Sequence, residues 1–169
     1  MKIIEGLKQI KDLKRKAEDL RGKVKNFCAI SSLETPTYPD QKKQVSEWIQ
    51  AHFDILKEIS NLKIRISNTN LNVEVTIELG GKQVTKTIAE WVIRRRELAK
   101  EDLAMWSMLT DRGIKEGMVN GPGGASIKVE LVRYYDPTER DNAKELYSSE
   151  PSIIDGRLEV VNAITDLFE

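Results

Sequence analysis

The sequence predicts a mainly α fold with minor β structure: a long antiparallel coiled-coil helical hairpin, followed by a smaller helical part that carries a β-hairpin and one further strand. Three observations support this prediction. Apolar residues recur at alternating steps of three and four over two long stretches, prolines separate these stretches, and the period then changes to two. The composition agrees, because 32% charged and 6% aromatic residues are typical of long solvated helices.

Residues 1–70 are predicted to form the hairpin. The first helix spans about residues 3–28, and its apolar row is Ile3, Leu7, Ile10, Leu13, Ala17, Leu20, Val24 and Phe27. Pro36 and Pro39 interrupt it, because proline disfavours helical backbone in the residue before it. The second helix runs to about Ser67, with the row Val45, Trp48, His52, Ile55, Ile59, Leu62 and Ile66. Two helices of similar length joined by a short loop fold back on each other.

Residues 71–169 are predicted to pack as one unit with the hairpin. Val73 to Leu79 alternates apolar and polar residues, Gly80-Gly81 suits a tight turn, and residues 82–85 return as the second strand. Thr87 opens a helix with a capping box that extends to about Asp111. Residues 117–126 read as a flexible glycine loop, 127–135 as a strand, and helices are expected from 136 and again from 151.

The charge balance gives no reason to expect binding to nucleic acid or to a membrane. Lys plus Arg and Asp plus Glu number 27 each, and no apolar run approaches the roughly 20 residues of a membrane span. We expect no signal peptide and a cytoplasmic location, in a bacterium or a phage-infected cell. Residues 1–27 nevertheless carry a net charge of +5 and residues 136–169 one of −6. These segments are two solvated faces, or the basic helix of one subunit lies against the acidic end of another.

Three short stretches carry a family resemblance: residues 64–70 (Ile-Arg-Ile-Ser-Asn-Thr-Asn), 91–97 (Trp-Val-Ile-Arg-Arg-Arg-Glu) and 154–167 (Ile-Asp-Gly-Arg through Thr-Asp-Leu). With the order of elements over nearly the whole chain, they resemble the septicolysin-like family of small bacterial and phage helical proteins. The chain departs from the family pattern where Arg96 or Glu97 replaces an Asp, and where Ala163-Ile164 replaces Asn-Trp. The resemblance implies an oligomeric helical fold and no particular activity.

The arginine run Arg94, Arg95 and Arg96 is the first candidate site for an anionic ligand. Consecutive helical residues point about 100° apart, so at most Arg95 shares the apolar stripe of Ile88, Trp91 and Leu98. An arginine in such a stripe needs a partner. An ion pair with Asp102 or with a glutamate of a neighbouring helix is favoured, and binding of a phosphate or carboxylate is the alternative.

Two further candidates lie in the second half of the chain. Gly123 and Gly124 could cradle an anion with backbone N–H groups, but the segment lacks the Lys-Ser/Thr of a P-loop and precedes a strand, so a mobile loop is favoured. Arg133 with Tyr134 and Tyr135 offers a cation beside two rings, which suits base stacking, although aromatic residues in strands more often belong to a core.

Catalysis and metal binding find little support in the sequence. His52 is the single histidine and lies on the apolar row, where a polar residue typically sets register or oligomeric state. Cys28 is the single cysteine, so no internal disulfide can form, and the hairpin should hold it away from His52. The spacing of His, Cys, Asp and Glu residues predicts no metal site and no cofactor.

We therefore expect a non-enzymatic homo-oligomeric binding protein. Ile49, Phe53 and Leu56 widen the row of the second helix beyond what one antiparallel partner needs, which predicts an even-numbered or six-fold assembly. Its subunit interfaces could sequester a small anionic, nucleotide-like ligand, for example as a phage counter-defence protein. The alternative is a structural, adaptor or inhibitor protein that binds a protein partner and no small ligand.

Overall fold

The computed structural model describes residues 1–168 and confirms the mainly α fold with minor β structure. Within these residues 64% of the chain is helical, in four helices, and two small antiparallel β-hairpins complete the fold. The chain divides into two compact units. The first comprises Met1–Val73, Thr87–Ala89 and residues 158–168, and the second comprises Glu74–Lys86 and Glu90–Arg157.

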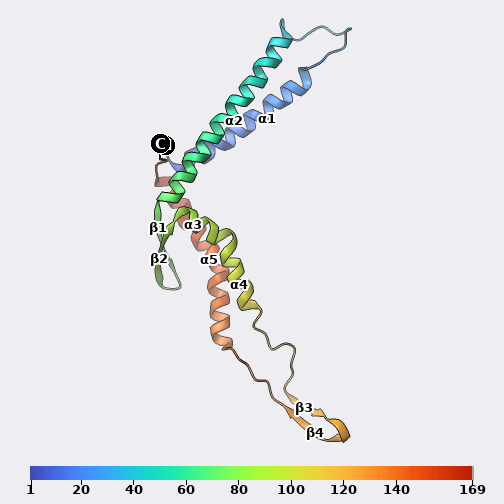
Figure 1. The fold of residues 1–169 in the computed structure, drawn as a ribbon, viewed down its shortest axis with the longest axis vertical. Coiled ribbons are helices and arrows are strands. Elements are labelled where there is room, and N and C mark those ends of the chain that lie inside the picture. The colour runs from blue at the N-terminus through green and yellow to red at the C-terminus, as the bar shows by residue number, and fades with distance from the viewer. Residues whose placement is uncertain (169) are drawn as a thin grey trace. The chain divides into compact units, whose positions relative to one another are not determined.

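The first unit is built on the predicted helical hairpin. Helices α1 (Ile3–Phe27) and α2 (Gln41–Asn72) lie side by side (Figure 1). The residues buried between and around them belong to the two apolar rows, namely Ile3, Ile10, Leu13 and Ala17 from α1 and Trp48, Ile59, Leu62 and Ile66 from α2. Leu7, which the spacing predicted in the apolar row of α1, is exposed, while Gly6 is buried. A Cβ at Gly6 would lie 2.9 Å from Leu167 Cδ1, so glycine permits the close approach of the C-terminal segment.

The loop end of the hairpin is closed by aromatic and polar contacts. The rings of Phe27, Tyr38 and Trp48 contact one another with centroids 5.3 to 5.7 Å apart. The Asp40 carboxylate accepts the backbone N–H of the third residue after it, and the Gln41 amide donates to the Phe27 carbonyl at 2.9 Å. The proline segment is therefore held between the helix ends.

The two termini meet within the first unit. Lys2 pairs with Asp166 both as an isolated β-bridge and through a 2.6 Å ion pair, which lowers the pKa of the aspartate. The buried Thr69 hydroxyl accepts the N–H of Phe168 at 2.9 Å and donates to the Arg65 carbonyl at 2.9 Å. These bonds accompany an α2 helix that continues past its expected end near Ser67 to Asn72.

The second unit begins with the predicted hairpin of β1 (Glu74–Leu79) and β2 (Lys82–Thr87). Both turn glycines, Gly80 and Gly81, have positive φ angles of 57° and 76°, as a tight hairpin turn requires. One continuous helix follows and is made of α3 (Ile88–Ile93), a π-helical segment (Arg94–Leu98) and α4 (Ala99–Ser107). The buried Trp91 indole donates to the Val75 carbonyl at 2.8 Å.

Two predicted elements of this unit differ in the structure. Residues 117–126 are not an irregular loop, because β3 (Gly117–Asn120) and β4 (Ser126–Val129) pair antiparallel, with Val119 opposite Ile127. Gly123 and Gly124 take positive φ angles of 80° and 79°, and a 2.7 Å bond from the N–H of Gly121 closes the turn. The expected strand 127–135 therefore ends at Val129.

The last helix also differs from the prediction. Helix α5 (Pro137–Ile164) is one element that contains Pro151, where the sequence predicted two helices. A proline inside a helix costs about 3 kcal/mol because it lacks a donor and crowds the preceding turn. Glu150 and Ile154, on either side of the proline, are both buried, and we attribute the continuity of the helix to this packing. None of the helices in residues 1–168 combines the length and apolar content that a bilayer span needs.

Candidate binding surfaces and arginine clusters

Arg94 lies in an ion-pair network of the second unit. Its Nε and Nη2 atoms donate to the two Glu150 oxygens at 2.5 and 2.9 Å, and its Nη1 lies 2.6 Å from Asp102. The Arg94 side chain is 20% exposed and that of Glu150 only 3%. The hydrogen bond with Glu150 raises the pKa of Arg94, with a smaller contribution from Asp102. This guanidinium is therefore already occupied by carboxylates.

Arg94 and Arg95 are both half-buried, and the π-helical segment that begins at Arg94 changes which of the residues after them face the interior. A π-turn accommodates an extra residue and shifts the phase of the helix after it. Ala99 is consequently buried, whereas Leu98, which the α-helical spacing predicted on the stripe, is exposed. Arg95 pairs with Asp155 instead of Asp102. Arg96 is exposed and makes no hydrogen bond or ion pair in the described part of the chain, so the three arginines point to different surroundings.

A groove of about 450 Å³ adjoins the Arg94–Glu150 pair. Its walls come from β1, β2, the α3 helix and α5, and most of the lining is apolar: Leu79, Val84, Trp91, Ile93, Leu98, Leu146 and Tyr147. The Tyr147 ring lies 5.5 Å from the Arg94 guanidinium. The charged groups of the lining balance, with Lys86 and Arg94 against Glu90 and Glu150, so this groove suits an apolar group better than an anion.

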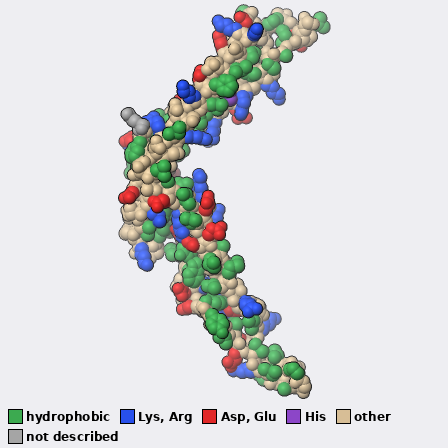
Figure 2. Space-filling view, in the orientation of Figure 1, with side chains coloured by type: hydrophobic (Ala, Val, Ile, Leu, Met, Phe, Trp, Pro, Cys, Tyr) green, Lys and Arg blue, Asp and Glu red, His purple; other side chains and the backbone are tan. Residues whose placement is uncertain are grey.

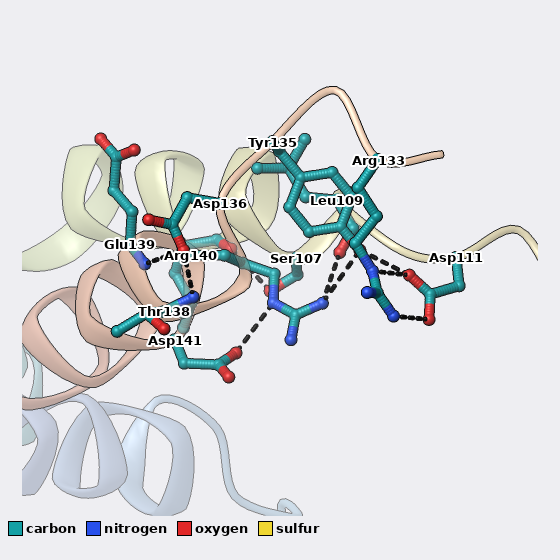
Figure 3. Close-up of polar contacts among 11 residues, drawn as sticks. Ser107, Leu109, Asp111, Arg133, Tyr135, Asp136, Thr138, Glu139, Arg140 and Asp141 are labelled. Carbon is teal, nitrogen blue, oxygen red and sulfur yellow. Dashed lines mark hydrogen bonds and ion pairs between the residues drawn. The ribbon is translucent and has the colours of Figure 1, made fainter. Parts of the chain in front are cut away.

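Arg133 and Tyr135 lie in a second polar cluster, centred on Asp111 (Figure 3). Arg133 donates from Nε and Nη2 to the two Asp111 oxygens, each at 2.7 Å, and the Tyr135 hydroxyl donates to Asp111 at 2.9 Å. The bonds from Arg133, followed by that from Tyr135, lower the pKa of Asp111 to about 2. Arg140 at the start of α5 donates to the Leu109 carbonyl at 3.1 Å. The cluster joins the segments that lead into and out of the β3–β4 hairpin.

The residues proposed from the sequence for one ligand site lie in three places. The arginine run is on the α3–α4 helix, Arg133 and Tyr135 are in the Asp111 cluster, and Gly123 and Gly124 form the turn of the β3–β4 hairpin. Tyr134 is 97% exposed and stacks on no other ring within residues 1–168. Sequence reasoning missed Asp111 and Glu150, whose neighbours in the sequence give no sign of their distant partners.

His52 and Cys28 occupy separate parts of the hairpin. The His52 Nδ1 atom lies 3.3 Å from the Ala17 carbonyl oxygen, and the exposed Cys28 follows the end of α1, where its thiol contacts the Lys25 carbonyl. Among residues 1–168 no group of three or more His, Cys, Asp or Glu side chains could hold a metal ion.

The exposed surface of α2 carries a second apolar row, which we call the outer row. It consists of Ile49, Phe53, Leu56, Ser60, Ile64, Ser67 and Leu71. Its five large apolar members are between 41% and 61% exposed. At about 100° per residue the outer row is centred roughly 120° around the helix from the buried row. A continuous exposed row of this kind is typical of a surface that binds another protein.

Helix α1 presents a basic row beside the same face of α2. Lys11, Lys14, Arg21 and Lys25 make no ion pair in the described chain and lie with Glu18 at spacings of three and four. Two grooves, of about 500 and 250 Å³, lie between this row and α2 and share Arg21 and His52 in their linings, with Leu56 in the larger and Ile49 in the smaller. Figure 2 shows hydrophobic and basic side chains exposed together along this hairpin. The hairpin surface thus combines apolar and unpaired cationic groups.

Comparison with known proteins identifies the fold but no function. No protein-family model and no curated protein matches the chain. The crystal structure of a functionally unknown conserved protein from Corynebacterium diphtheriae is similar over 99% of each chain, with a TM-score of 0.59 and 18% identity. At this identity the similarity concerns the fold alone, and the septicolysin-like resemblance stays a prediction.

Proposed function

We propose that this protein is a non-enzymatic, homo-oligomeric assembly or adaptor protein that associates through the outer row of α2. The observation that supports the proposal is the exposure of five large apolar side chains in one continuous row on a helix whose other apolar row is already buried. Covering half-exposed Leu, Ile and Phe side chains stabilises an interface by roughly 1 kcal/mol each. The proposed setting is the cytoplasm of a bacterium or of a phage-infected cell.

The arginine clusters support binding through a protein surface over sequestration of a nucleotide-like ligand. Arg94, Arg95 and Arg133 are each paired with a carboxylate, so an anion would have to displace Glu150, Asp155 or Asp111. Displacing a carboxylate from a bidentate pair leaves that carboxylate without its cation. Arg96 remains as the unpaired member of the predicted set, and one exposed cation defines no pocket.

The oligomeric state of three proteins tests the proposal. Wild-type protein should exceed the monomer mass of 19.3 kDa in light scattering. Leu56→Lys places a charge in the outer row and should raise the dissociation constant at least about tenfold. Asn61→Lys adds the same charge on the polar side of α2, about 100° around the helix from the outer row, and should leave the dissociation constant unchanged. A wild-type protein that remains at 19.3 kDa at every concentration would refute self-association.

A second candidate function rests on the basic row of α1. Its unpaired cations line a groove together with the apolar Leu56 and Ile59 of α2, a combination that suits an amphipathic helix with an acidic edge from another protein. A synthetic acidic amphipathic peptide should then bind in a salt-sensitive manner, and Lys14→Glu with Arg21→Glu should abolish the binding. Lys8→Glu with Lys16→Glu changes the net charge equally, away from the groove, and serves as the control. Equal losses in both double variants would indicate a non-specific charge effect.

A further inference from the structure

The spacing of the outer row is symmetric about Ser60. Three members precede Ser60 by 4, 7 and 11 positions, and three follow it by the same intervals. A helix read in the opposite direction therefore presents the same pattern when Ser60 is the centre. Such a row complements itself across a two-fold axis perpendicular to the helix.

We propose that two copies of the chain pair through antiparallel α2 helices, with the two-fold axis at Ser60. This inference rests on the self-association proposed above and specifies its interface. Ile49 then lies opposite the partner's Leu71, Leu56 opposite the partner's Ile64, and the two Ser60 residues meet at the axis. The contact extends over the 23 residues from Ile49 to Leu71, or roughly 33 Å at 1.5 Å per residue.

Side-chain sizes along the row agree with this register. Phe53 is the largest member of the outer row, and in this pairing it faces the partner's Ser67, one of the two smallest. Large side chains opposite small ones fill the space between helices at native density. The small Ser60 pair allows the two helices to approach closely at the axis.

In neighbouring antiparallel registers the outer row pairs less well with its copy on the partner. A shift by one heptad in one direction places Leu71 opposite the partner's Lys42, where an apolar side chain meets a charge. The opposite shift leaves Ile49 beyond the end of the partner's α2, which finishes at Asn72. The register centred on Ser60 pairs all seven members, and it is the alignment the row favours.

Cysteine cross-linking measures the register directly. In a Cys28→Ser background, which removes the single native thiol, Ser60→Cys should give a covalent dimer with a short bis-maleimide. Ile49→Cys alone should give none, because its two copies would lie roughly 33 Å apart along the paired helices. An equimolar mixture of Ile49→Cys and Leu71→Cys proteins should cross-link again. Light scattering on the same samples reports whether they associate.

A size-exchange experiment provides an independent test. Phe53→Ser removes the large partner and Ser67→Phe creates two facing phenyl groups, so each should weaken association at least about tenfold. The combined variant exchanges large and small positions and should recover most of the wild-type affinity. Failure of this rescue, or cross-linking of Ile49→Cys alone as efficiently as Ser60→Cys, overturns the register in a protein that still associates. A monomeric wild type overturns both the register and the proposed function.

Discussion

The Arg94–Glu150 pair predicts that its two members contribute unequally to stability. Arg94→Met removes the guanidinium and leaves the Glu150 carboxylate, whose side chain is 3% exposed, without a cation. An uncompensated buried charge of this kind typically costs about 3–5 kcal/mol. Because 20% of the Arg94 side chain remains exposed, we expect a loss of unfolding free energy near the lower end, about 3 kcal/mol.

Replacing Glu150 should lower the free energy of unfolding less than replacing Arg94. Glu150→Gln keeps an acceptor oxygen of the same shape, and Arg94 retains Asp102 at 2.6 Å, so the expected loss is about 1–2 kcal/mol. Replacing Arg94 and Glu150 together by Met removes both buried charges. The double variant should lie within about 1 kcal/mol of the wild type, which corresponds to a large favourable coupling in the double-mutant cycle.

Urea unfolding followed by circular dichroism at 222 nm measures these differences, with the unfolding slope checked for constancy across the variants. The reasoning predicts that Arg94→Met is the least stable of the three and that adding the second substitution restores stability. It is refuted if Arg94→Met and Glu150→Gln lower the free energy of unfolding equally, or if the double variant is less stable than either single variant. If Arg94→Met leaves the free energy of unfolding unchanged, the Arg94–Glu150 pair is solvated.

Three other contacts give shorter tests. The guanidinium of Arg133 is the main cause that lowers the pKa of the Asp111 carboxyl from 3.8 to about 2. The ionised carboxylate therefore stabilises the fold at pH values above 3.8, and this contribution is lost as the pH falls toward 2. A carbon-13 titration of Asp111 with its midpoint at pH 3.8 would contradict this. Gly22→Ala in open space on α1 should stabilise by about 0.5–1 kcal/mol, whereas Gly81→Ala, at a φ of 76°, should destabilise by about 1–2 kcal/mol in thermal unfolding. Thr69→Val should cost about 1 kcal/mol and speed hydrogen exchange at the Phe168 amide, while Thr69→Ser should not.

The hairpin and the first β-hairpin could be predicted because their signals are local. Heptad spacing along each helix, the proline segment between them and the Gly80-Gly81 turn are all recorded within short stretches of sequence. Helix ends were less predictable, since α2 runs on to Asn72, where Thr69 bonds the distant C-terminal segment. A local pattern fixes the kind of element, while its end depends on what it contacts.

The candidate site was the least predictable part, for a related reason. Three adjacent arginines look equivalent in the sequence, but Arg94 bonds Glu150, which is 56 positions away, whereas Arg96 is exposed to solvent. Asp111 and Arg133 likewise meet across the β3–β4 hairpin that the glycine-rich segment forms. Which charges neutralise each other depends on distances between remote segments, and no periodicity records those distances.

The sequence by itself determined the mainly helical class, the rows that join α1 to α2, and the excess of apolar positions on α2. Tertiary structure decided which of these positions stay exposed, because only packing against α1 separates the buried row from the outer row. It also decided that Pro151 lies within a continuous α5. Helical periodicity follows from the covalent geometry of the backbone, whereas burial and charge pairing follow from the arrangement of whole elements in space.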